Sequence, residues 1–277
     1  MTGVPGRALT WAGAGLVVTV GLSALLAPWL APYDPAEQLV GRPFQGPGAG
    51  HVLGADRYGR DVLSRVLWGG RETLLLAGSV LLLSVAGGVV LGALTALLPR
   101  RADALASRLL DLVVAFPLII VALAWVGFVG PSAAAVTTAL VITLWAPFAR
   151  QARSLVRAAL AAPSARATAL LGASRGRLLW REVLPRLRGP VVVLAALEAG
   201  QVITVVAGLG FLGLGAQPPS AEWGAMLQDG RSAIRSAPHL VVAPGAAVLV
   251  VVLGLTLLAE GLRDLTARGM EVARVRV

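Results

Sequence analysis

Few residues of this 277-residue chain are of a type that could do chemistry. All 24 basic residues are arginines, so the chain has neither the lysine of a Walker A phosphate loop nor a Schiff-base amine. It has no cysteine, and its two histidines, His51 and His239, lie far apart in sequence. We therefore expect no catalytic residue, no metal site and no bound cofactor in this chain.

One carboxylate is unusual because it lies inside an apolar stretch. Glu198 follows Pro190 by eight residues, which places it roughly 12 Å along a helix and near the middle of a bilayer. Gln201 and Thr204 follow at steps of three residues and would extend a polar stripe. The stripe lines either a translocation path or, with Glu198 protonated, a hydrogen-bonded contact inside a helical bundle.

The composition that surrounds these residues is that of a membrane protein. The chain is 57% hydrophobic and only 14% charged, whereas soluble domains carry about a quarter charged residues. Its formal net charge is +10, and the arginines gather beside apolar stretches. This placement favours an anionic membrane surface as the partner and argues against nucleic acid.

Six apolar stretches approach or exceed the length of about 20 residues that a membrane-spanning helix needs. They are Ala8–Leu30, Thr73–Leu98, Leu109–Val129, Ser132–Phe148, Val191–Leu214 and Leu240–Leu262. We expect the first to be a retained anchor, because its apolar run is too long for a cleaved signal peptide. The sequence predicts an all-α integral membrane protein with six transmembrane helices in a single domain, residues 1–277.

The arginines also predict the orientation. With the N-terminus inside, 17 of the 24 arginines lie on the cytoplasmic side, so the positive-inside rule places both termini in the cytoplasm. Three long connections then follow: an outer elbow region at 31–72, a cytoplasmic loop at 149–190 and an outer loop at 215–239.

The cytoplasmic loop predicts two short helices that meet at a bend. Pro163 can open a turn, Gly172 can end the first helix with a positive φ, and Ser174 can cap the second, which Pro185 would end. The loop is basic, and two interpretations stay open: it lies on anionic lipid, or it fits a groove on a cytoplasmic partner.

The two outer segments predict short helices as well. In the elbow region, Asp56 would cap a surface helix that Gly69 and Gly70 break before the second span. In the outer loop, Ser220 would cap a helix that Gly230 closes.

Four segments together resemble permeases of binding-protein-dependent ABC importers. The family's ATPase-docking loop is similar to ATALLGASRG at 167–176, followed by Leu184-Pro185. The dipeptide, oligopeptide and nickel branch of the family is similar to HVLGADRYGRDVLSRVLWGGRETL at 51–74, GLGFLGLGAQPPSAEWG at 208–224 and AEGLRD at 259–264. The resemblance covers most of the chain from His51 onward.

The resemblance implies two sets of site residues, for the ATPase and for the binding protein, and the polar stripe supplies a third. Docking of the ATPase would involve Arg166, Ala167, Thr168, Gly172, Ala173, Ser174, Arg177, Leu184 and Pro185, with Arg166 standing where the family has an acidic residue. The translocation path would be lined by Glu198, Gln201 and Thr204. The binding protein would contact Gln217, Pro218, Pro219, Glu222 and Trp223, the alternative being an outer loop that packs on itself and plugs the outer mouth.

The family further implies the type I ABC importer permease fold in the bacterial inner membrane. Its partners would be a second homologous permease in a heterodimer, two ATP-binding cassette subunits that carry ATP and Mg²⁺, and an extracytoplasmic solute-binding protein. We expect small di- or oligopeptides as the solute. Nickel or another metal chelate is the alternative, because residues 197–215 look more like nickel permeases. A stand-alone secondary transporter or channel is a third interpretation, although it would need an inverted repeat that we do not find in the sequence.

Overall fold

The computed structural model describes the backbone of residues 6–275, and their side chains except those of Arg100, Ala169, Arg175 and residues 266–275. Between residues 6 and 275 there is no β-strand, in agreement with the all-α prediction. The helices are α1 (Gly6–Leu25), α2 (Ala27–Leu30), α3 (Val62–Ala96), α4 (Arg100–Ala115), α5 (Leu118–Val129), α6 (Ala133–Ala161), α7 (Pro163–Leu170), α8 (Arg175–Leu178), the π-helical turn η1 (Leu179–Val183), α9 (Leu184–Phe211), α10 (Trp223–Gly230), the 3₁₀ turn η2 (Arg231–Ala233) and α11 (His239–Val275).

Five segments within the described range are long and apolar enough to cross a membrane: α1, α3, α6, residues 176–211 and residues 239–265. The predicted third span, Leu109–Val129, is wrong as a straight helix, because α4 and α5 meet at 81°. Pro117 has no amide proton to continue the helix, and Phe116 before it is extended, with φ −76° and ψ 129°. Counted together, the bent pair gives the sixth crossing.

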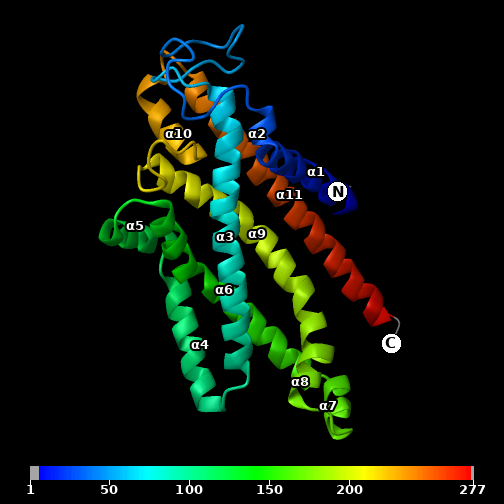
Figure 1. Cartoon of the computed structure of the whole chain (residues 1–277). Coiled ribbons are helices and arrows are strands. Elements are labelled where there is room, and N and C mark those ends of the chain that lie inside the picture. The colour runs from blue at the N-terminus through cyan, green and yellow to red at the C-terminus, as the bar shows by residue number, and fades with distance from the viewer. Residues whose placement is uncertain (1–5, 276–277) are drawn as a thin grey trace.

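The helices form an elongated bundle around α3 (Figure 1). α1 packs along α11, and α6 and α9 pack against α3. One end carries the cap, which we define as residues 31–61 together with α10, and the opposite end carries the hairpin, residues 163–183 (Figure 1). Gly6 at the start of α1 lies against Gly261 and Asp264, in the second half of α11 and more than ten residues before its last residue, Val275.

Small residues let the helices approach closely. A Cβ atom on Gly92 of α3 would lie 2.2 Å from the carbonyl oxygen of Ala149 in α6, and one on Gly88 would lie 2.4 Å from that of Trp145. Glycine at these positions removes the side chain that would hold two helices apart in a membrane.

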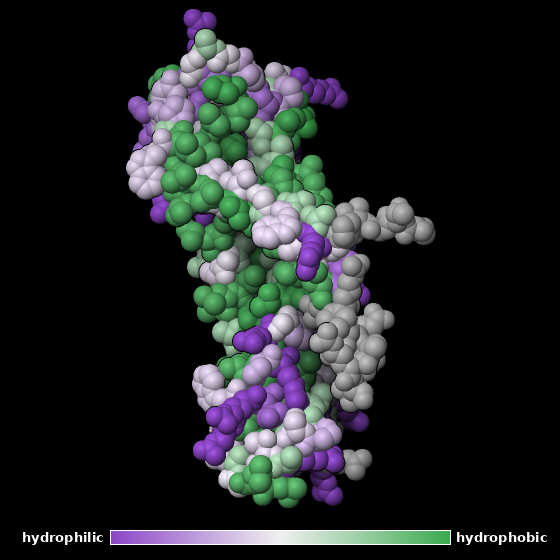
Figure 2. Space-filling view, turned by 90° about the vertical axis from the view of Figure 1, so that its right-hand side faces the viewer, coloured by the Kyte–Doolittle hydropathy of each residue, from purple (hydrophilic) through white to green (hydrophobic). Residues whose placement is uncertain are grey.

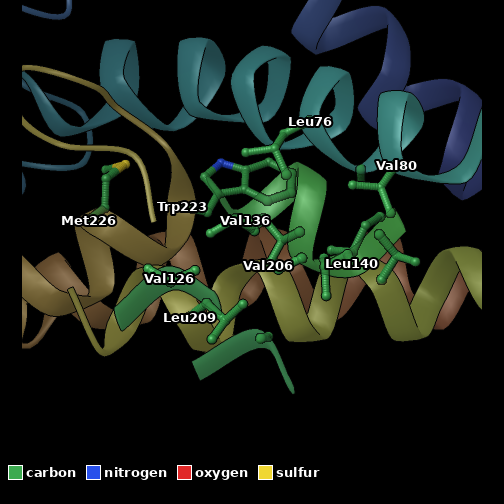
Figure 3. Close-up of a cluster of buried hydrophobic side chains, with 14 of the residues drawn as sticks. Leu76, Val80, Val126, Val136, Leu140, Val206, Leu209, Trp223 and Met226 are labelled. Atoms are coloured by element: carbon green, nitrogen blue, oxygen red, sulfur yellow. The ribbon is translucent and has the colours of Figure 1, made fainter. Parts of the chain in front are cut away.

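The central core lies where the cap meets the bundle (Figure 3). Trp223 of α10 is 2% exposed and packs in one cluster with Leu76 of α3, Val136 of α6 and Val206 of α9. Four helices, α3, α6, α9 and α10, therefore contribute to one apolar cluster.

The predicted elbow helix is wrong. The N-cap is Asp61, whose carboxylate accepts from the amide of Ser64 at 2.8 Å, and α3 then runs without a break through Gly69 and Gly70. The two glycines make room for the cap: a Cβ on Gly69 would lie 2.1 Å from the carbonyl oxygen of Ala221.

Candidate functional site

The hairpin has the bend that the sequence predicts. α7 ends at Leu170, Gly172 has a φ of +79°, and the amide of Arg177 donates to the hydroxyl of Ser174 at 3.4 Å as α8 begins. The amide of Leu171 donates to the carbonyl of Ala167 at 3.1 Å, which closes the last turn of α7. The positive φ favours glycine at position 172, although the space around it is open.

Polar contacts tie the hairpin to the helices on either side of it. The hydroxyl of Ser164 donates to Glu182 at 2.9 Å, and Arg186 contacts the same carboxylate at 3.2 Å. Arg186 also donates to the carbonyl of Ala159 at the end of α6, at 3.3 Å. These contacts connect the hairpin to the end of α6 and to the beginning of α9.

The predicted stop at Leu184-Pro185 is wrong. These residues begin α9, and the chain passes into it through the π-helical turn of residues 179–183. Proline is tolerated in the first turn of a helix, because its missing amide proton would have no partner there. Correspondingly, α6 runs to Ala161 and the hairpin is shorter than the predicted loop of 149–190.

The hairpin exposes large apolar side chains that the sequence analysis did not single out. Leu170 and Leu171 are each 89% exposed, and Trp180 is 73% exposed. At the lower end of the molecule, where Figure 1 places α7 and α8, Figure 2 shows a hydrophobic patch bordered by hydrophilic side chains. The position of Leu170 and Leu171 directly before the bend glycine, Gly172, is the sequence signal that could have identified the two leucines. Exposed apolar residues of this size fit a site that a partner protein covers.

The predicted docking residues lie in the hairpin and in the first turn of α9. Their side chains are mostly exposed, and Ala173 and Thr168 are half-buried. The exposed ones are Arg166, Ala167, Gly172, Ser174, Arg177, Leu184 and Pro185.

A cavity of about 260 Å³ brings together part of the predicted polar stripe. It lies beside the break between α4 and α5, and its lining includes Phe116 and Pro117 from the break, Thr143 and Pro147 from α6, and Glu198 and Gln201 from α9. Thr204 is not among its described lining residues, and its hydroxyl donates to the carbonyl of Gly200 at 2.9 Å.

In the outer loop, the structure separates the five predicted contact residues into two groups. Gln217, Pro218 and Pro219 are exposed, and the amide of Gln217 donates to the carbonyl oxygen of Gly215 at 3.0 Å. A second cavity, of about 520 Å³, opens beside them, and its lining includes Gln217 and Glu72 together with Glu222 of the second group.

Glu222 and Trp223 form the second group, and their burial within this chain argues against the predicted contact of these two side chains with the binding protein. Glu222 is 1% exposed and replaces the predicted Ser220 as the N-cap of α10, accepting from the amides of Gly224 and Ala225 at 2.8 and 2.9 Å. Burial raises the pKa of Glu222, although these hydrogen bonds oppose the shift. The indole of Trp223 donates to the carbonyl of Val66 at 2.9 Å, so both side chains hold the cap on α3.

A buried ionic network in the cap also escaped the sequence analysis. Arg60, 3% exposed, donates to Asp56 at 2.6 Å and to Asp229 of α10 at 3.3 Å. His51 contacts the N-capping carboxylate of Asp61 at 2.9 Å. Asp56 therefore pairs with Arg60 rather than capping a helix, and residues 31–61 and α10 form one polar unit.

The chain matches known proteins over most of its length. Residues 88–272 match the family described as binding-protein-dependent transport system inner membrane component. The di/tripeptide transport system permease protein DppC of Pseudomonas aeruginosa is 40% identical, over 87% of this chain and 82% of that protein. The probable D,D-dipeptide transport system permease protein DdpC of Escherichia coli is 37% identical, over 94% and 87%. A crystal structure of an amino acid ABC transporter has the same fold, with a TM-score of 0.56 at 18% identity, over 71% of this chain and 92% of that one.

Proposed function

The chain belongs to the family of binding-protein-dependent transport system inner membrane components, and on this premise we propose that it is a permease subunit that carries small peptides through the bacterial inner membrane. Peptides are favoured over nickel or another metal chelate, because the relatives described above are named as peptide permeases. Membership of the family also sets aside a stand-alone secondary transporter or channel.

The observation that carries the proposal is the exposed apolar tip of the hairpin, at the end of the bundle opposite the cap. Leu170 and Leu171 enter a groove of a cytoplasmic ATP-binding cassette subunit, and the residues from Arg166 to Pro185 surround this contact. ATP and Mg²⁺ bind to that partner. Closure of the ATPases pushes the hairpin, and the contacts of Arg186 and Glu182 pass the movement to α6 and α9.

The remaining partners follow from the same arrangement. The hairpin and both termini face the cytoplasm, as the arginine distribution predicts, and the cap faces outward. Gln217, Pro218 and Pro219 contact the solute-binding protein. A second homologous permease completes a heterodimer, and two ATPases complete the importer.

Reconstitution of the importer tests this function. The intact complex is placed in proteoliposomes with its binding protein, and ATP-dependent uptake of labelled Ala-Ala is measured. The double variant Leu170→Ala/Leu171→Ala is expected to lose ATPase co-purification and uptake while it keeps its thermal stability. Val52→Ala, an exposed apolar residue of the cap at 65% exposure, is the control and should retain both. Full uptake by the double variant, or no peptide uptake by the wild type, would contradict the proposal.

A further inference from the structure

We propose that Glu198 binds the protonated amino group of the transported peptide in the cavity beside the α4–α5 break. The inference rests on the proposed function and specifies which end of the peptide this subunit recognises.

The position of Glu198 is the first argument. It lies half-buried near the middle of α9, in a segment apolar enough to cross the membrane. Among the described side chains, none forms a hydrogen bond or ion pair with its carboxylate.

The second argument is the charge of the cavity. Of the described residues that line it, Glu198 is the sole ionisable one, and none is an arginine or a histidine. A carboxylate without a partner inside a membrane is costly, and a cationic ligand offsets that cost. The carboxylate end of a peptide would be repelled from the same cavity. The cavity therefore selects the ammonium end.

The third argument is the number of acceptors. An alkyl ammonium group has three donors and no acceptor. The cavity offers the carboxylate of Glu198 and the amide oxygen of Gln201. Pro147 has no amide proton, so it leaves the backbone carbonyl of Thr143 without its usual donor from residue 147. The hydroxyl of Thr143 donates its proton to the carbonyl of Ala139 at 2.8 Å, so toward the cavity it can act only as an acceptor.

The size of the cavity agrees with one end of a small peptide. Its volume of about 260 Å³ is near the lower limit of ligand pockets, which begin at roughly 300 Å³. Phe116 and Pro117 supply apolar walls next to the polar groups. Because these two residues form the break between α4 and α5, a change of that angle would reshape the cavity. The ammonium group would then be bound or released as the bundle moves.

Direct binding to the complex tests the inference without selection by the binding protein. The permease–ATPase complex is placed in nanodiscs with no binding protein, and the Kd values of Ala-Ala and N-acetyl-Ala-Ala are measured by calorimetry. The wild type is expected to bind the free peptide about 10- to 100-fold more tightly, as loss of a charge-assisted contact predicts. Glu198→Gln should abolish this preference and Glu198→Asp should retain it. Glu37→Gln, which removes an exposed charge in the cap, should leave it unchanged.

The outcomes separate this inference from the proposed function. Equal affinity of the wild type for both peptides, or no measurable binding of Ala-Ala, overturns the role of Glu198 without reference to any variant. An undiminished preference in Glu198→Gln overturns it as well. Uptake of Ala-Ala by the complete importer is measured in parallel: if uptake is present, only the inference fails, whereas absent uptake rejects the proposed function itself.

Discussion

Replacing Gly92 by alanine is expected to force α3 and α6 apart. The added Cβ would lie 2.2 Å from the carbonyl oxygen of Ala149 and 2.8 Å from its Cα atom. Carbon–oxygen contacts between packed helices normally lie at about 3.3 Å, so one helix must move by about 1 Å. Both obstacles are backbone atoms, which cannot rotate away.

The cost can be worked out from these distances. Overpacking in a close-packed interior destabilises by about 1–3 kcal/mol, and a rigid obstacle favours the upper part of that range. Alanine returns up to about 1 kcal/mol through its higher helix propensity. A net loss of about 2 kcal/mol remains, which corresponds to a fall in Tm of about 4–8 °C for a chain of this size.

The assay is thermal unfolding of the purified complex in nanodiscs. Gly87→Ala is the matched control, because it lies on the same helix and an added Cβ there meets nothing within 4 Å. Its Tm should be unchanged or slightly higher. Ala149→Gly should not rescue Gly92→Ala, since the contact involves the backbone of Ala149. Equal Tm values for Gly92→Ala and Gly87→Ala, or rescue by Ala149→Gly, would refute the packing argument.

Three further perturbations test other parts of the structure. The carboxylate of Asp103 is 6% exposed and contacts Arg153 at 2.6 Å and Arg157 at 2.7 Å. Asp103→Asn breaks these ion pairs and should destabilise the folded chain by about 2–3 kcal/mol in thermal unfolding. Asp111→Asn is the control and should have almost no effect, because the contact of Asp111 with Arg150 is exposed. Gly69→Ala should lower both Tm and peptide uptake by displacing the cap, whereas Gly78→Ala, with open space around it, should change neither. Because burial raises the pKa of Glu222, the folded state holds its proton to a higher pH than the unfolded state. The stabilisation that protonated Glu222 gives the folded state is thus complete below pH 4.5, the ordinary pKa of the group, and is lost as the pH rises through the raised pKa. The Tm of Glu222→Gln should therefore depend less on pH over that range than the Tm of the wild type. Identical pH profiles for the two proteins would contradict this.

The sequence by itself determined the features that depend on local chemistry. Apolar length predicts the spans, because each helix must satisfy its own backbone hydrogen bonds in lipid. The bend of the hairpin at Gly172 follows from the backbone freedom of glycine, and the intramembrane position of Glu198 follows from counting residues. These features need no knowledge of what packs against them.

Only the tertiary structure decided what the same local signals become in context. Gly69 and Gly70 read as a helix break, yet they lie inside a continuous helix because the cap needs their empty space. Glu222 and Trp223 read as outer contacts, yet they are buried against α3. Whether a glycine breaks a helix or admits a neighbour, and whether a carboxylate faces a partner or caps a helix, depends on contacts between residues some 150 positions apart. Such contacts leave no periodic pattern in the chain, so the fold alone sets them.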